Sequence, residues 1–107
     1  MGDAVVNRCV LDDGTVVVDL RGELDLAIND ALRLLLVDTA VRMRPPRIVV
    51  DMLHVSFVDS TGIGALAAGY NAARSAGVEF SVRHLAPFVA RQLRITGLYD
   101  QLAAAPD

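Results

Sequence analysis

The stretch that decides the fold runs from Ile48 to Leu66 and reads IVVDMLHVSFVDSTGIGAL. Its first part, Ile48–Met52, is almost continuously apolar, which is typical of a strand buried on both faces of a parallel sheet. Leu53–Val58 is less regular and predicts a partly apolar loop. A helix then begins, with Asp59 or Ser60 as its N-cap. The stretch therefore predicts a strand, a loop and a helix in succession.

The residues before this stretch predict a hairpin and a helix. Val5–Leu11 and Thr15–Arg21 flank an Asp-Asp-Gly turn, which indicates two antiparallel strands. Gly22–Asp25 is expected to break the second strand. Leu26–Arg44 then shows apolar residues at helical spacing and is ended by two prolines.

The residues after the stretch predict one more strand and one more helix. Glu79–Leu85 alternates between apolar and polar residues, and a third helix opens at Pro87. The order β-β-α-β-α-β-α favours right-handed crossovers and parallel strands. We therefore expect an α/β fold, with helices packed on a mixed four- to five-stranded sheet. The chain reads as a single domain over residues 1–107, with frayed termini at 1–4 and 103–107.

This topology predicts where a site would lie. Loops that follow parallel strands emerge at the same edge of a sheet, and such folds usually place their sites there. Gly22–Asp25, Leu53–Ser60 and Leu85–Ala86 are therefore expected to meet. Asp25 and Ser60 would then be neighbours, although 35 residues separate them.

Composition excludes several classes of function. The 107 residues carry 10 basic and 13 acidic side chains, and a net charge of −3 argues against nucleic acid as a partner. All 10 basic residues are arginines, so chemistry that requires a lysine is excluded. One cysteine and two histidines cannot form a Cys/His zinc cluster, and we expect no metal and no cofactor. Without a membrane span or signal peptide, a soluble cytoplasmic protein is expected.

The helix that begins near Asp59 has an unusual first turn. Gly62 and Gly64 each cost about 1 kcal/mol there relative to alanine, and glycine is used where a backbone or ligand must come close. A helix N-terminus also favours an anion. An exposed Ser60 hydroxyl could therefore carry a phosphate, beside Asp59 and, by the predicted topology, near Asp25. The alternative is that Ser60 is only a cap and that the glycines serve helix–sheet packing.

Three motifs give the chain a family resemblance. They are GELDL at Gly22–Leu26, IVVDMLHVSFVDSTGIGAL at Ile48–Leu66, and LRITGL at Leu93–Leu98. The most specific part is DSTGIG at Asp59–Gly64, because it follows an apolar strand and has GELD upstream. With these motifs, Val16–Leu102 resembles a STAS domain, and most closely an anti-sigma-factor antagonist.

The resemblance implies a switch controlled by phosphorylation. In this family the unphosphorylated antagonist binds an anti-sigma factor with a GHKL-type serine kinase domain and releases the sigma factor. The kinase then phosphorylates the serine that corresponds to Ser60, and a serine phosphatase restores the complex. By resemblance, Asp25 helps partner recognition, Asp59 flanks the acceptor, and Thr61 is a secondary candidate acceptor. The expected partner-binding residues are Glu23, Asp25, His54, Asp59, Ser60, Thr61, Gly62 and Gly64.

His54 departs from the family pattern, which usually has a small residue there. It is expected on a loop close to the site, either as a surface or half-buried histidine or as a partner contact. The protein is expected to be a monomer or a weak dimer and not an enzyme.

One alternative function stays open, and others are disfavoured. The open alternative is a STAS scaffold or accessory subunit of a stress-signalling or transport complex, in which Ser60 is not phosphorylated. Gly62–Ala67 also fits a dinucleotide-binding fingerprint, but the loop from the preceding strand is too long. A receiver domain built on Asp51 would need a lysine. A hydrolase built on Ser60 and His84 would need an oriented base and an oxyanion hole, whereas His84 is expected in the core or at the end of the sheet.

Overall fold

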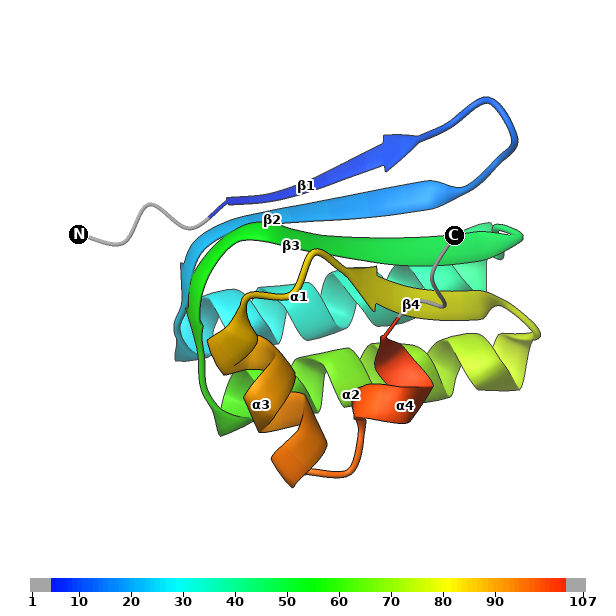
Figure 1. The fold of residues 1–107 in the computed structure, drawn as a ribbon. Helices are drawn as coiled ribbons and strands as arrows, with labels where there is room; N and C mark the ends of the chain where they lie inside the picture. Colours follow the sequence, from blue (N-terminus) through cyan, green and yellow to red (C-terminus); the bar gives the residue numbers. More distant parts are fainter. Residues whose placement is uncertain (1–4, 104–107) are drawn as a thin grey trace.

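The computed structural model describes residues 5–103, which fold into one mixed sheet with helices against it (Figure 1). The strands are β1 (Val5–Val10), β2 (Val16–Leu24), β3 (Arg47–Val58) and β4 (Glu79–Arg83). The helices are α1 (Leu26–Asp38), α2 (Ser60–Ala76), α3 (Pro87–Ile95) and α4 (Tyr99–Leu102), and a π-helical turn, η1 (Thr39–Met43), follows α1.

The sheet has the order β1-β2-β3-β4. β1 is antiparallel to β2, whereas β2, β3 and β4 run parallel to one another. The expected α/β fold and order of elements are confirmed. Ala103 adds an isolated parallel bridge to Val82 in β4. The predictions for residues 1–4 and 104–107 lie outside the described residues.

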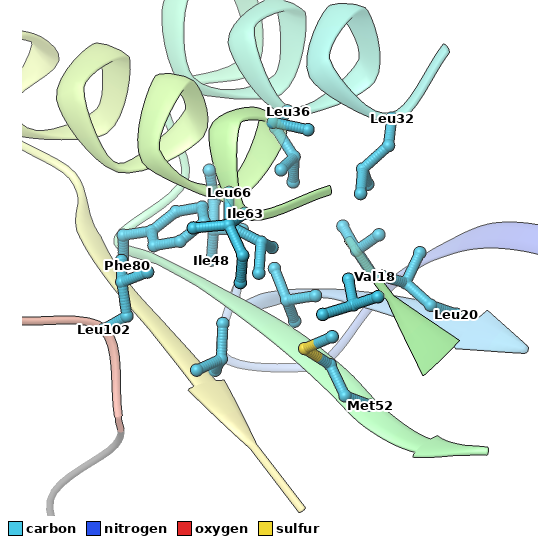
Figure 2. Packing of buried hydrophobic residues seen from close by; sticks show 14 of the residues in the cluster. Val18, Leu20, Leu32, Leu36, Ile48, Met52, Ile63, Leu66, Phe80 and Leu102 are labelled. Atoms are coloured by element: carbon cyan, nitrogen blue, oxygen red, sulfur yellow. The ribbon is translucent and has the colours of Figure 1, made fainter. Parts of the chain in front are cut away.

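The core lies between the sheet and the pair of helices α1 and α2, which cover the same face of the sheet (Figure 1). Figure 2 shows side chains from β2 and β3 facing those from both helices; they include Val18, Leu20, Leu32, Leu36, Ile48, Met52, Ile63 and Leu66. Apolar side chains of α3 and α4, among them Val89, Leu93 and Leu102, are also fully buried. The N-terminal ends of α1 and α2 are thus positioned by the apolar packing of both helices on the sheet.

Two predicted breaks in the sheet are wrong. β3 continues through Leu53–Val58, which was expected to be a loop, and β2 continues to Leu24. The two strands pair to the end, with Gly22 opposite Val55 and Leu24 opposite Val58. Register shifts along β2 explain the irregular sequence pattern, because they interrupt the strict alternation of inward and outward side chains.

Smaller differences concern the ends of elements. The helix expected over Leu26–Arg44 changes to a π-helical turn after Asp38 and ends at Arg44 in a left-handed conformation, with φ of 46°. β4 ends at Arg83, two residues before the expected end at Leu85.

Candidate functional site

The candidate site lies where β2 and β3 end and where α1 and α2 begin. Leu24 and Val58 are register partners, so the residues that follow them, Asp25 and Asp59, leave the sheet from neighbouring positions. The Asp25 carboxylate accepts a hydrogen bond of 3.0 Å from the backbone N–H of Ile28 and caps α1. The predicted meeting of these two segments is therefore observed, and each supplies an acidic N-cap.

Asp59 is the cap of α2, so the sequence alternative of Ser60 as the cap is wrong. One Asp59 carboxylate oxygen accepts hydrogen bonds from the backbone N–H groups of Thr61 at 2.9 Å and Gly62 at 3.2 Å. The hydrogen bond from the Thr61 hydroxyl, followed by the one from the Gly62 N–H, lowers the pKa of Asp59. Ser60 is the first helical residue and is exposed. Its hydroxyl is in no hydrogen bond within residues 5–103.

A buried amide joins the two helix ends. Asn29, in the second turn of α1, is only 2% exposed. Its Nδ2 donates to the Leu24 carbonyl at 3.0 Å and to Thr61 Oγ1 at 2.7 Å, and lies 3.4 Å from Asp59 Oδ1. The Thr61 hydroxyl in turn donates to Asp59 Oδ1 at 2.6 Å. We call these three side chains, Asn29, Thr61 and Asp59, the polar bridge.

The sequence patterns did not single out Asn29. The available signal was its position three residues before Leu32 and seven before Leu36, on the buried face of α1. A polar residue at such a position needs a hydrogen-bond partner. Its side-chain partners, Asp59 and Thr61, lie 30 to 32 residues further along the chain, so helical periodicity could not reveal them.

The two glycines of the first turn have different surroundings. A Cβ atom at Gly62 would lie 2.5 Å from Val58 Cγ2 and 3.2 Å from Asn29 Oδ1, so packing inside the protein requires glycine there. A Cβ atom at Gly64 would meet nothing within 4 Å among the described residues. Gly64 instead lines an open groove of about 320 Å³ between α1 and α2, together with Leu26, Asp30, Arg33 and Ala65. The packing explanation therefore accounts for Gly62 but not for Gly64.

Exposed apolar side chains flank the acidic caps. Phe57 of β3 and Phe88 of α3 stack with ring centroids 5.8 Å apart, although 44% and 42% of their surfaces are exposed. Phe57 is the register partner of the exposed Glu23 and lies two residues before Asp59. Leu26, the first residue of α1, is 69% exposed. These apolar residues were not among the expected site residues. The start of α3 brings the segment after Leu85 and Ala86 toward the site.

His54 is not on a loop, as expected, but on β3, where it is exposed and paired with Arg21. It precedes Asp59 by five residues, which corresponds to about 16 Å along an extended strand. Because β3 does not end at Met52, the predicted loop around His54 is wrong, and its role in partner binding stays a prediction.

His84 lies at the end of β4, one of the two expected places. It is exposed, and its ring Nδ1 lies 3.0 Å from Asp51 Oδ1. Arg83 donates two further hydrogen bonds of 3.2 Å to the same carboxylate. Burial of Asp51 opposes its ionisation, but hydrogen bonds from the Leu53 N–H, His84 and Arg83 outweigh it and lower the pKa. His84 thus contacts Asp51, midway along β3, and is not held by Asp51 as a base for Ser60.

Two further observations bear on function. Among residues 5–103, no cluster of three or more His, Cys, Asp or Glu side chains is arranged to hold a metal ion. None of the helices in this range is both long and apolar enough to cross a membrane.

A family model described as "Mlab, STAS domain" matches residues 8–103. The match begins within β1 and covers β2, β3, β4 and both capped helices. The chain therefore belongs to the STAS domain family.

Within this family, the chain is similar to proteins named as anti-sigma-factor antagonists. An anti-sigma F factor antagonist of Paenibacillus polymyxa is 31% identical over 86 residues, which cover 80% of this chain and 74% of the relative. The crystal structure of an anti-sigma factor antagonist from Mycobacterium paratuberculosis has a TM-score of 0.77 at 31% identity, covering 96% of this chain and 87% of that one.

More distant structures share the fold. Unphosphorylated SpoIIAA, an anti-sigma factor antagonist, superposes with a TM-score of 0.80 at 20% identity, covering 96% of this chain and 90% of that one. A unit of the murine anion transporter Slc26a9 has the same fold, with a TM-score of 0.70 at 20% identity over 94% of this chain and 19% of the transporter.

Proposed function

We propose that this protein is an anti-sigma-factor antagonist that is switched off by phosphorylation at Ser60. In its unphosphorylated form it binds a kinase-type anti-sigma factor in the cytoplasm, and the sigma factor is released. A serine phosphatase reverses the modification. The observation that carries the proposal is the exposed Ser60 hydroxyl at the start of α2, with the Asp59 cap before it and the Asp25 cap leaving the neighbouring strand.

The geometry favours Ser60 over Thr61 as the acceptor. The Thr61 hydroxyl donates to Asp59 and accepts from Asn29, whereas the Ser60 hydroxyl is exposed at the surface. The N-terminus of a helix also favours negative charge. A phosphate on Ser60 therefore fits the end of α2 without a change in the core.

The effect of the phosphate on binding is electrostatic. A phosphoserine carries about −1.5 to −2 charges at pH 7. It would add to the negative charges of Asp59, the preceding residue, and Asp25, which follows the neighbouring strand; capping hydrogen bonds hold both carboxylates. A partner surface that accommodates these two carboxylates would then face a much larger negative charge, or a steric block, at the centre of the contact.

The surroundings of the caps fit a protein partner. Leu26, Phe57 and Phe88 are exposed apolar side chains next to the acidic residues Glu23, Asp25 and Asp59. Aromatic residues often supply much of the binding energy of an interface, with polar residues at the rim. We propose that this mixed surface, together with Ser60, Thr61, Gly62 and Gly64, contacts the anti-sigma factor. His54, exposed on β3, is a further candidate contact.

The test uses purified kinase-type anti-sigma factors encoded in the same genome as this chain. Each is incubated with the protein and Mg-ATP, and intact mass and binding are measured. We expect one kinase to add a single phosphate and to lose affinity for the modified protein. Ser60→Ala should keep binding and block the phosphate gain, whereas Ser75→Ala, an exposed serine on the same helix, should change neither.

A different outcome would favour the alternative function. No phosphate gain with any of these kinases, together with partner binding that Ser60→Asp leaves unchanged, would rule out the switch. Such a result would point to a scaffold or accessory subunit of a larger complex.

A further inference from the structure

We infer that Asn29 is a positioning residue that determines which of two adjacent hydroxyl groups, on Ser60 or on Thr61, accepts the phosphoryl group. The inference rests on the proposed phosphorylation of this site. It concerns a buried residue of α1 that is outside all the sequence motifs of the site.

The polar bridge occupies the Thr61 hydroxyl from two sides. Asn29 Nδ2 donates to Thr61 Oγ1 at 2.7 Å, and the Thr61 hydroxyl donates its proton to Asp59 Oδ1 at 2.6 Å. Both distances are at the short end of the usual range for such bonds. Thr61 is exposed as a residue, but its oxygen is held toward the contact between α1 and α2.

Phosphoryl transfer needs an oxygen that is free to turn. The acceptor Oγ forms a bond to the γ-phosphorus of ATP while the bond from that phosphorus to the bridging β–γ oxygen breaks. ADP leaves, and the hydroxyl proton passes to a base. In-line attack requires a lone pair of the acceptor oxygen to point at the phosphorus, and the two hydrogen bonds of Thr61 Oγ1 hold this oxygen in one orientation, toward the contact between α1 and α2. Ser60 has no such restraint.

Asn29 is well fixed for this role. Its amide also donates to the Leu24 carbonyl at 3.0 Å, so the side chain is tied to the end of β2 as well as to α2. Its Oδ1 is buried and has no hydrogen-bond partner within the described part of the chain. A buried amide oxygen without a partner is unfavourable for stability.

The decisive experiment compares acceptor sites in a background without the serine. Ser60→Ala should take up almost no phosphate from the kinase that modifies the parent protein. The Ser60→Ala, Asn29→Ala double variant should gain phosphate on Thr61, with a rate at least about fivefold higher, the order expected from one lost hydrogen bond. Peptide mapping by mass spectrometry identifies the residue, and adding Thr61→Val should abolish the gain.

A matched control separates positioning from a general loss of stability. Thr39 is also buried and hydrogen-bonded, ten residues further along, at the start of η1. Thr39→Val in the Ser60→Ala background should lower stability without exposing Thr61 to the kinase. Equal phosphate uptake in the Thr39 and Asn29 variants, or none in the Asn29 variant, would overturn the inference. Lack of phosphate on the parent protein with every kinase would instead overturn the proposed function.

A second measurement does not depend on a kinase. Three-bond NMR couplings report the Thr61 χ1 angle directly. We expect a single rotamer in the parent protein and averaging between rotamers in Asn29→Ala, with the amide shifts of β3 and β4 unchanged. A single unchanged Thr61 rotamer in Asn29→Ala would show that Asp59 alone holds the hydroxyl, and Asn29 would lose its assigned role.

Discussion

Helices α1 and α2 meet at two places that differ in chemistry. Near the middle of α2 the contact is apolar and tight, since a Cβ atom at Gly69 would lie 2.8 Å from Leu36 Cδ1 and 3.1 Å from a ring carbon of Phe80. Near the N-termini the contact is the polar bridge, and Gly64 beside it faces an open groove.

The apolar contact stabilises the fold, whereas the contact near the N-termini forms part of the candidate site. At the middle contact, the side chains of Leu36 and Phe80 fill the space next to Gly69. At the N-terminal contact, Gly64 has free space around it, and apolar side chains near the caps stay exposed. Substitutions at the first place should therefore change stability, and substitutions at the second should change binding.

The largest effect is expected for Phe57→Ala. Removing an exposed aromatic anchor should weaken binding of the anti-sigma factor roughly ten- to thirtyfold, or about 1.4–2 kcal/mol, as for a typical interface hot spot. Stability should fall by no more than about 1 kcal/mol, because the stacked pair with Phe88 is half exposed. Titration calorimetry and thermal unfolding measure the two effects.

The control for this variant is Ile95→Ala. Ile95 is 71% exposed at the far end of α3, away from the caps. Its substitution should leave affinity unchanged. If both variants weaken binding equally, the interface is not centred on the acidic caps.

The next effect is expected for Gly69→Ala. Overpacking against Leu36 and Phe80 costs about 1–3 kcal/mol, whereas the helix preference of alanine returns up to about 1 kcal/mol. The net loss should be near 1 kcal/mol, which lowers the Tm by roughly 4–8 °C for a domain of this size. Partner affinity of the folded protein should not change; a loss of affinity at full stability would contradict the division between the two contacts.

A smaller effect of opposite sign is expected for Gly64→Ala. The new methyl group meets no atom of the chain within the described residues, so alanine should stabilise α2 by about 0.5–1 kcal/mol. The same methyl group enters the groove and should weaken partner binding. A variant that is more stable and binds as tightly as the parent would show that no partner approaches α2 at Gly64.

The sequence predicted most strands and helices better than the ends of β2 and β3 near the candidate site. The hairpin, β4, α2 and the ends near Gly77 and Gly97 follow from local turn and period signals. The second half of β3 was not predicted because buried residues recur there at every third position instead of every second. Val55 and Val58 are buried, and two exposed residues precede each of them. Only pairing with the shifted register of β2 makes that pattern a strand.

The site was predictable in part. The neighbourhood of Asp25 and Asp59 followed from topology, because parallel strands deliver their ends to one edge. The partners of Asn29 and the stacking of Phe57 on Phe88 did not, because each joins segments about 30 residues apart that no local pattern relates.

The smallest expected effect is a pH dependence that Asp59 contributes. Its pKa is lowered from 3.8 by the Thr61 hydroxyl and the Gly62 N–H, so the folded state prefers the ionised form. The sign follows from linkage: this stability is present above pH 3.8 and is lost as the pH falls through the lower folded pKa. Asp59→Asn keeps a good N-cap and should flatten the fall in Tm on acidification, measured by thermal unfolding between pH 3 and 7.

Asp13 provides the comparison for that measurement. Its pKa is also lowered, by hydrogen bonds from the Thr15 backbone and side chain in the hairpin turn, far along the chain from the caps. Asp13→Asn should also reduce the fall in Tm at low pH, and it should leave partner binding unchanged. Asp59→Asn should change both the pH dependence of the Tm and partner binding. Asp59→Asn could change the pH dependence of the Tm but leave binding and phosphorylation unchanged. In that case the Asp59 carboxylate serves only to cap α2, and partner binding depends on Ser60 and the exposed apolar residues near it.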